Sequence, residues 1–137
     1  MPVVSVSLMN LPGTEAAVGW AGGHCVIADR PDGKAGGMGL GFNGAQLLAL
    51  AIGGCLCNDL RHVAHRRGVV IATLSVKVRL TLEGDPLIAS GADVSVQCGM
   101  ADGSDPQPLI DEAKASSMVG CSLPRGIPVS LSAGQGA

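Results

Sequence analysis

Two of the five cysteines lie where a thiol could carry out redox chemistry. Cys55 lies in the segment 51–57 (AIGGCLC), inside an apolar stretch where a nearby polar group could activate its sulfur as a nucleophile. Cys121 lies near Arg125 in a turn after a second predicted helix, a position from which a thiol can move toward an oxidised partner. Either residue taken alone is also typical of a buried cysteine that packs as a small hydrophobic side chain. The two cysteines therefore have two possible interpretations, a redox pair or two residues that pack in the interior.

The other cysteines and one histidine complete the inventory of reactive side chains. Cys57 follows Cys55 by two residues, and on a helix such side chains point about 200° apart, so the two neither pair nor chelate together. Cys25 alternates in a predicted strand and is expected to pack, and Cys98 ends a strand without a visible partner. His24 follows two glycines near the loop that precedes the Cys55 helix, which makes it a candidate site residue.

A metal site could be drawn from Asp59, His62 and His65, which follow one another at helical spacing. Three positive charges around them oppose cation binding: Arg61, Arg66 and Arg67. We therefore predict a solvated helix end and no metal. The glycine-rich segment 36–41 lacks the Lys-Ser/Thr of a phosphate-binding loop, and no G-x-S-x-G nucleophile motif occurs.

Composition limits the class of protein. The 137 residues are 47% hydrophobic and 15% charged, which indicates a single folded domain rather than a disordered chain. The formal net charge of −2 and the presence of one Trp, one Phe and no Tyr argue against a nucleic-acid partner. We expect such a small apolar chain to bury further surface by forming an oligomer.

No targeting or membrane segment is predicted. Residues 1–10 alternate as a strand does and lack a basic leader, and the apolar stretch 45–57 is shorter than the roughly 20 residues that span a bilayer. An odd number of cysteines without a signal peptide favours reduced thiols and a cytoplasmic location.

The elements that would position these residues form an α+β pattern of largely antiparallel strands. Asn43 is the predicted N-cap of a long helix that ends at Arg67 with Gly68 as its C-cap. The first half of this helix is apolar on every side and is expected to be buried all round, and its glycine pair, Gly53 and Gly54, suggests that another helix or subunit approaches closely. Alternation and turn residues predict the remaining elements: strands at 3–8, 15–20 and 24–28, a flexible loop at 29–41, strands at 69–82 and 92–98, a helix at 107–119 and a strand at 127–131.

This order, with one cysteine in a glycine-containing helix and another after the next helix, resembles the OsmC/Ohr family of osmotically inducible and organic hydroperoxide resistance proteins. The resemblance is carried by residues 42–55 (FNGAQLLALAIGGC), the strand 74–82 and the segment 113–129, and it covers nearly the whole chain as one domain, 1–137. It implies an intertwined homodimer with two sites at the subunit interface and thiol-based reduction of organic hydroperoxides without a bound cofactor. Cys55 would match the peroxidatic cysteine and Cys121 the resolving cysteine, and a dihydrolipoyl protein or another thiol would reduce their disulfide.

Three positions depart from the family pattern. A family Glu ten residues before the reactive cysteine is replaced by Ala45, with Gln46 beside it, and a family Arg after paired glycines is matched by His24. The usual Cys-Pro is Cys121-Ser122. A neutral histidine can orient a thiol and a protonated one can stabilise its anion. The candidate catalytic residues are therefore Cys55, Cys121, His24 and Gln46.

Three functions remain open at this point. The first is a cytoplasmic peroxidase that acts on alkyl or fatty-acid hydroperoxides through Cys55 and Cys121. The second is a non-catalytic dimer that binds a small apolar ligand at the subunit interface, which would account for the missing carboxylate and guanidinium. The third is a structural or interaction domain, in which the two Cα atoms lie well beyond the roughly 7 Å that a disulfide can bridge.

Overall fold

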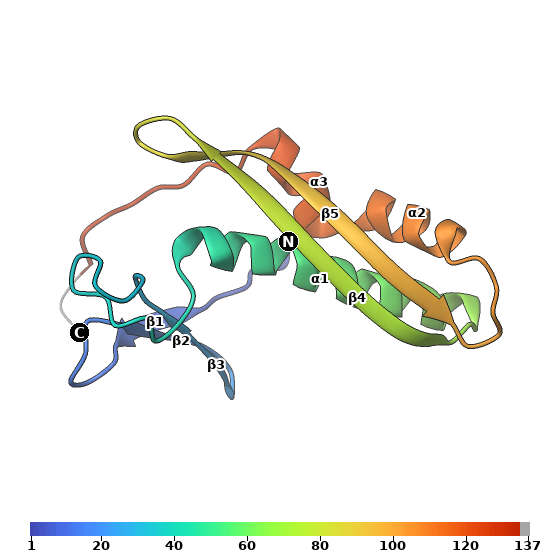
Figure 1. Cartoon of the computed structure of the whole chain (residues 1–137), viewed down its shortest axis with the longest axis horizontal. Coiled ribbons are helices and arrows are strands. Elements are labelled where there is room, and N and C mark those ends of the chain that lie inside the picture. Colours follow the sequence, from blue (N-terminus) through green and yellow to red (C-terminus); the bar gives the residue numbers. More distant parts are fainter. Residues whose placement is uncertain (135–137) are drawn as a thin grey trace. The chain divides into compact units, whose positions relative to one another are not determined.

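The structure is a computed structural model of the chain, and it describes residues 1–134. It is an α+β fold, as the sequence predicts, with three N-terminal strands, a long helix, a hairpin and short C-terminal helices (Figure 1). The contacts divide it into two compact units. The meander unit contains Met1–Leu50 and Val78–Asp93, and the core unit contains Ala51–Lys77 and the described chain from Val94 onward.

The meander unit begins with three short antiparallel strands, β1 (Ser7–Asn10), β2 (Ala17–Ala21) and β3 (His24–Ala28) (Figure 1). β2 and β3 form a tight hairpin in which Ala21 pairs with His24 across two glycines, and Gly22 adopts the positive φ of 59° that such a turn requires. The predicted meander is confirmed. The predicted strand at 3–8 is misplaced, because β2 offers pairing positions only to Ser7–Asn10 and the residues before Ser7 have no strand beside them in the described chain.

The loop at 29–41 has no regular structure, as predicted, and one carboxylate holds it together. The buried side chain of Asp29 accepts hydrogen bonds from the backbone N–H groups of Leu40 at 3.0 Å, Met38 at 3.1 Å and Arg30 at 2.8 Å. These hydrogen bonds, led by that of Leu40, hold the pKa of Asp29 below its ordinary value although burial opposes them. Asp29 thus fixes the course of the loop between β3 and the long helix.

The long helix, α1, runs over Gly44–Arg67 between the predicted caps. The Asn43 side chain accepts a hydrogen bond from the Gln46 N–H at 2.9 Å, and the Gln46 side-chain oxygen accepts one from the Asn43 N–H at 3.0 Å. This reciprocal capping box fixes the first turn. Gly68 takes a φ of +70° and ends the helix, so both predicted ends are confirmed.

Burial along α1 differs from the prediction. The buried residues of the helix are Ile52, Gly53, Leu60, Val63 and Ala64, whereas Leu50 in its first half is 46% exposed. The expectation of all-round burial is wrong for the single chain, because the core cluster packs against the second half of the helix. By length and composition alone α1 could also cross a membrane, but a core helix passes the same test.

The hairpin consists of β4 (Ile71–Glu83) and β5 (Ile88–Met100), which pair in a two-stranded sheet (Figure 1). The strand predicted at 69–82 matches β4 closely. The second strand is longer than the predicted 92–98, because pairing with β4 continues the extended backbone beyond the alternating segment.

The predicted helix at 107–119 is broken at Ser117. α2 (Gln107–Ser116) ends there and the short helix α3 (Met118–Ser122) begins after it, because Ser117 adopts an extended backbone with a ψ of 118°. A 3-10 turn, η1 (Leu123–Arg125), follows. The predicted strand at 127–131 is wrong: this segment has no regular structure, and its three alternating hydrophobic residues are exposed because no strand of the described chain lies beside it.

One hydrophobic cluster holds the core unit together. Its buried members come from α1, β4 and α2: Leu60, Val63, Ala64, Ile71, Leu109 and Ala113. Partly buried residues of the hairpin and helices surround them, and they include Leu56 one turn before Leu60. The cluster holds the second half of α1 against α2, and its edge includes Leu56, the residue after Cys55.

An ion-pair cluster joins the same two helices at the surface. Arg66 and Arg67, in the last turn of α1, both pair with the carboxylate of Glu112 on α2. Partial burial works against ionisation of Glu112, but hydrogen bonds and the positive charges of both arginines lower its pKa below the ordinary value.

Candidate active site

Cys55 lies on α1 with two polar partners. Its thiol donates a hydrogen bond to the Asp59 carboxylate at a sulfur–oxygen distance of 3.4 Å. The hydroxyl of Ser117 donates to the Cys55 sulfur at 3.6 Å. Cys55 is half-buried, and Ser117 is only 4% exposed. The sulfur is therefore held between a proton acceptor and a hydroxyl donor.

The elements explain how these three side chains meet. Asp59 follows Cys55 by one helical turn, so both side chains lie on the same side of α1. Ser117 reaches the sulfur from the break between α2 and α3, where its extended backbone turns the hydroxyl inward. Because the α2 residues before this break are fixed in the core cluster, the hydroxyl is held by packed structure.

Cys121 lies one turn after Ser117, on α3. Its backbone N–H donates to the Ser117 carbonyl at 2.9 Å, and its exposed thiol donates to the Ala115 carbonyl at 3.4 Å. Both Cys55 and Cys121 are free thiols. Each contacts the segment 115–117, but among the described residues no direct contact joins their two sulfurs.

The other two predicted site residues lie in the meander unit. His24 is exposed at the start of β3, next to the two-glycine turn. Gln46 forms the capping box of α1, in which its side-chain oxygen accepts a hydrogen bond from Asn43. The observed contacts therefore join Cys55 with Asp59 and Ser117, and they give Gln46 a structural role at the helix start.

The remaining cysteines differ in their surroundings. Cys98 packs against the core cluster, and burial raises the pKa of its thiol although the charge of Arg61 opposes this shift. Such a thiol is a poor nucleophile. Cys25 lies opposite Trp20 in the strand register and is exposed, so the expectation that it packs is wrong for the single chain. Cys57 is half-buried on α1.

Of the two polar partners of Cys55, only Asp59 could have been identified from the sequence. Asp59 lies four residues after Cys55, a spacing that brings side chains together on a helix. From the sequence we consider Asp59 only as a possible metal ligand with His62 and His65, and we do not pair it with the thiol. No sequence signal points to Ser117, because its contact depends on a helix break that the sequence pattern does not predict.

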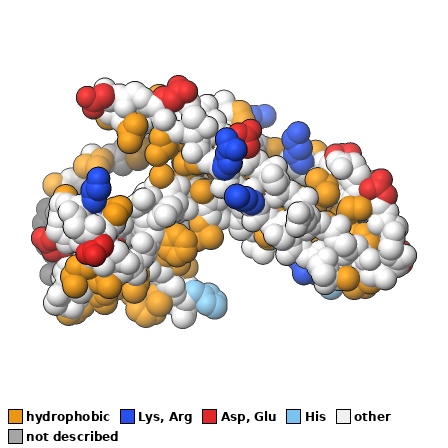
Figure 2. Space-filling view, in the orientation of Figure 1, with side chains coloured by type: hydrophobic (Ala, Val, Ile, Leu, Met, Phe, Trp, Pro, Cys, Tyr) orange, Lys and Arg blue, Asp and Glu red, His pale blue; other side chains and the backbone are white. Residues whose placement is uncertain are grey.

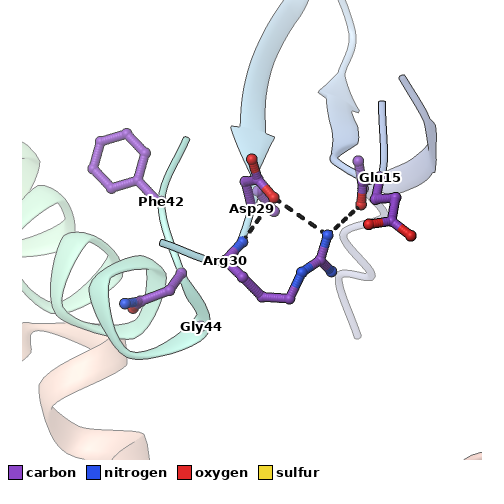
Figure 3. A pocket seen from close by; sticks show the side chains of 8 residues that line it. Glu15, Asp29, Arg30, Phe42 and Gly44 are labelled. Carbon is purple, nitrogen blue, oxygen red and sulfur yellow. Dashed lines mark hydrogen bonds and ion pairs between the residues drawn. The ribbon is translucent and has the colours of Figure 1, made fainter. Parts of the chain in front are cut away.

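The meander unit contains a separate open pocket of about 270 Å³. Figure 3 shows Arg30 in it, with its guanidinium donating to the Glu15 carbonyl at 2.7 Å and pairing with Asp29 at 3.3 Å. The ring of Phe42 lies on another side of the pocket (Figure 3). Because Arg30 is already engaged by two oxygens and none of the four predicted site residues lines this pocket, we assign no reaction to it.

Comparison with known proteins identifies similar chains. The family described as OsmC-like protein matches residues 36–132. Among solved structures, an OsmC-like protein of unknown function from Vibrio cholerae has a TM-score of 0.72 at 12% identity over 90% of this chain and 94% of that chain. An OsmC-like protein from Mycoplasma pneumoniae has a TM-score of 0.73 at 13% identity, covering 90% and 88% of the two chains. An organic hydroperoxide resistance protein from Legionella pneumophila has a TM-score of 0.60 at 18% identity, covering 88% and 90%. None of the curated proteins matches the sequence.

Proposed function

Because this chain belongs to the OsmC-like protein family, we propose that it is a thiol-dependent peroxidase that reduces organic hydroperoxides. Cys55 is the peroxidatic cysteine and Cys121 the resolving cysteine. The family relationship supports the reaction class, because several of its structural neighbours are named as organic hydroperoxide resistance proteins. The environment of Cys55 supports the choice of nucleophile.

The reaction has two chemical steps and one reductive step. The Cys55 thiolate attacks the terminal oxygen of the hydroperoxide, the O–O bond breaks, and the products are a sulfenic acid and an alcohol after the alkoxide takes up a proton. The Cys121 thiol then attacks the sulfenic sulfur, forms the disulfide and releases water. A dithiol such as a dihydrolipoyl group, or another thiol, reduces the disulfide and is itself oxidised.

The observation that carries this proposal is that Ser117 contacts both cysteine residues. Its hydroxyl contacts the Cys55 sulfur and its carbonyl accepts the N–H of Cys121, so the helix of the second thiol starts at the contact of the first. A disulfide requires Cα atoms about 4.4–6.8 Å apart. Resolution would need the five-residue helix α3 to move until the Cα atoms of Cys55 and Cys121 reach that separation.

The proposal includes a homodimer located in the cytoplasm. Figure 2 shows hydrophobic side chains on the visible surface of the meander unit. The exposed large hydrophobic residues of this unit include Leu8, Met9, Trp20 and Val26. Leu50 in the first half of α1 and the exposed hydrophobic residues of the segment 127–131 add apolar surface. A monomer seldom leaves so much apolar surface in water, so a second copy of this chain is the partner that we propose.

The test is the intact mass of the reduced protein after one equivalent of an organic hydroperoxide such as cumene hydroperoxide. We expect a loss of about two mass units, from a disulfide that peptide mapping assigns to Cys55 and Cys121. Cys121→Ser is expected to stop at the sulfenic acid, with a gain of about 16 mass units. Cys55→Ser is expected to remain unoxidised.

Cys57→Ser is the matched control, because it removes a thiol two residues away on the same helix and is expected to leave the disulfide unchanged. A wild-type protein whose mass stays constant would contradict the peroxidase. That result would favour the alternative, a dimer that binds a small apolar ligand without redox chemistry.

A further inference from the structure

The polar partners of Cys55 suggest how the proton of the reaction is handled. We propose that Asp59 accepts the proton of the Cys55 thiol and returns it to the alkoxide that leaves the hydroperoxide, while the Ser117 hydroxyl holds the sulfur by donating a hydrogen bond to it. This inference rests on the proposed peroxidase function and assigns two residues to it.

The proton balance of the first step closes with these groups alone. The thiol proton passes from the Cys55 sulfur to the Asp59 carboxylate while the sulfur electron pair attacks the terminal oxygen. The O–O bond breaks and the alkoxide takes the proton from the Asp59 carboxyl, so the products are a sulfenic acid, an alcohol and the original carboxylate. No proton has to come from bulk water, and general acid–base catalysis of this kind contributes about 10²- to 10⁴-fold in rate.

Asp59 is suited to this role because the thiol is its hydrogen-bond partner. The bond of 3.4 Å is within the range for a sulfur donor, and a nucleophile next to a base is the arrangement expected for an activated cysteine. Among the described residues no lysine, arginine or histidine forms an ion pair with Asp59, although Glu112 on α2 pairs with two arginines. The carboxylate therefore remains available to accept the thiol proton.

Ser117 differs from its neighbour in the direction of its hydroxyl. The Ser116 hydroxyl donates back to the Glu112 carbonyl at 3.0 Å, as serines at helix ends commonly do. The Ser117 hydroxyl instead donates to the Cys55 sulfur from a side chain that is nearly fully buried. A hydrogen bond to a sulfur that becomes an anion is stronger than one to a neutral thiol, so this contact gains strength as the reaction proceeds.

The experiment compares two reactions of the full-length reduced protein and its variants. The first is oxidation of Cys55 by cumene hydroperoxide at pH 7, followed by intact mass in the Cys121→Ser background. The second is alkylation of Cys55 by iodoacetamide at pH 9.5, where hydroxide is available as the base and the leaving iodide takes up no proton. The variants are Asp59→Asn and Ser117→Ala, with Asp111→Asn and Ser116→Ala as matched controls on α2.

We expect Asp59→Asn to slow the peroxide reaction by about 100-fold, and alkylation by less than about threefold, since only the peroxide reaction needs a proton returned. Ser117→Ala is expected to slow the peroxide reaction by about tenfold, and the two controls to match the parent protein. Asp59→Glu, which restores a carboxylate, is expected to recover part of the loss.

Two other results would overturn the inference. Equal losses in both reactions of Asp59→Asn would mean that the change disturbs the structure around Cys55. Faster oxidation in Asp59→Asn would mean that the carboxylate only repels the sulfur anion. In both cases the proposed peroxidase function would still stand, provided that the parent protein is oxidised. A parent protein that is not oxidised at all would overturn both that function and the proton path through Asp59.

Discussion

Truncation of Leu60 tests the core that positions Cys55. Leu60 is fully buried on α1, one turn after Leu56 and five residues after the thiol, and it packs in the cluster with Leu109 and Ala113 of α2. Leu60→Ala removes three carbon groups, which at about 0.8 kcal/mol each amount to about 2.4 kcal/mol of lost burial. A residual cavity adds about 24 cal/mol per Å³, so about 40 Å³ left unfilled adds about 1 kcal/mol. We expect the free energy of unfolding to fall by about 3 kcal/mol.

Urea unfolding followed by circular dichroism measures this loss, with all proteins at one concentration because a dimer makes stability concentration-dependent. Leu87→Ala is the control, since Leu87 is exposed in the turn between β4 and β5 and its truncation is expected to cost less than about 0.5 kcal/mol. Oxidation of Cys55, followed by intact mass, is expected to be slower in Leu60→Ala and unchanged in Leu87→Ala. Equal, small losses in the two variants would refute the packing that we describe around α1.

Two further predictions concern charge and self-association. Because the pKa of Glu112 is lowered in the folded state, its ion pairs stabilise the fold above the ordinary carboxyl value of 4.5, and the contribution is lost as pH falls through the lowered value. The difference in unfolding free energy between the parent protein and Glu112→Gln is therefore expected to be constant near neutral pH and to shrink in acid; a constant difference down to pH 2 would contradict this. Gly54 is exposed on α1 with open space beside it, so in a chain without a partner Gly54→Ala would stabilise the helix by about 1 kcal/mol. If a second copy packs there, sedimentation equilibrium is expected to find weaker dimers instead, and unchanged dimers would count against that contact.

Local signals explain which elements could be predicted from the sequence. The ends of α1 depend on Asn43, Gln46 and Gly68, which act on the backbone within a few residues of themselves. The β2–β3 hairpin depends in the same way on its two-glycine turn. The predicted ends of these elements lie within two residues of the observed ones, because their caps and turns are encoded in adjacent residues.

Elements that depend on distant partners could not be predicted in this way. The segment 127–131 alternates as a strand does, but a strand needs a neighbour, and the described chain places none beside it. The first half of α1 is apolar on every side, but burial requires other elements to cover it. In both places the sequence pattern states a preference for burial that the single chain does not meet, and this unmet preference is itself an argument for a second copy.

The candidate site contains one contact that local spacing predicts and one that depends on distant parts of the chain. Cys55 and Asp59 belong to one helix, so their contact follows from helical spacing and is predictable from the sequence alone. The contact of Ser117 with the sulfur spans 62 residues and requires both the α2–α3 break and the core cluster that fixes α2. The break places the hydroxyl on the first thiol and starts the helix of Cys121, so one backbone feature accounts for both halves of the proposed chemistry. A continuous helix through residue 117 would keep the cysteines in the sequence and lose the arrangement that relates them.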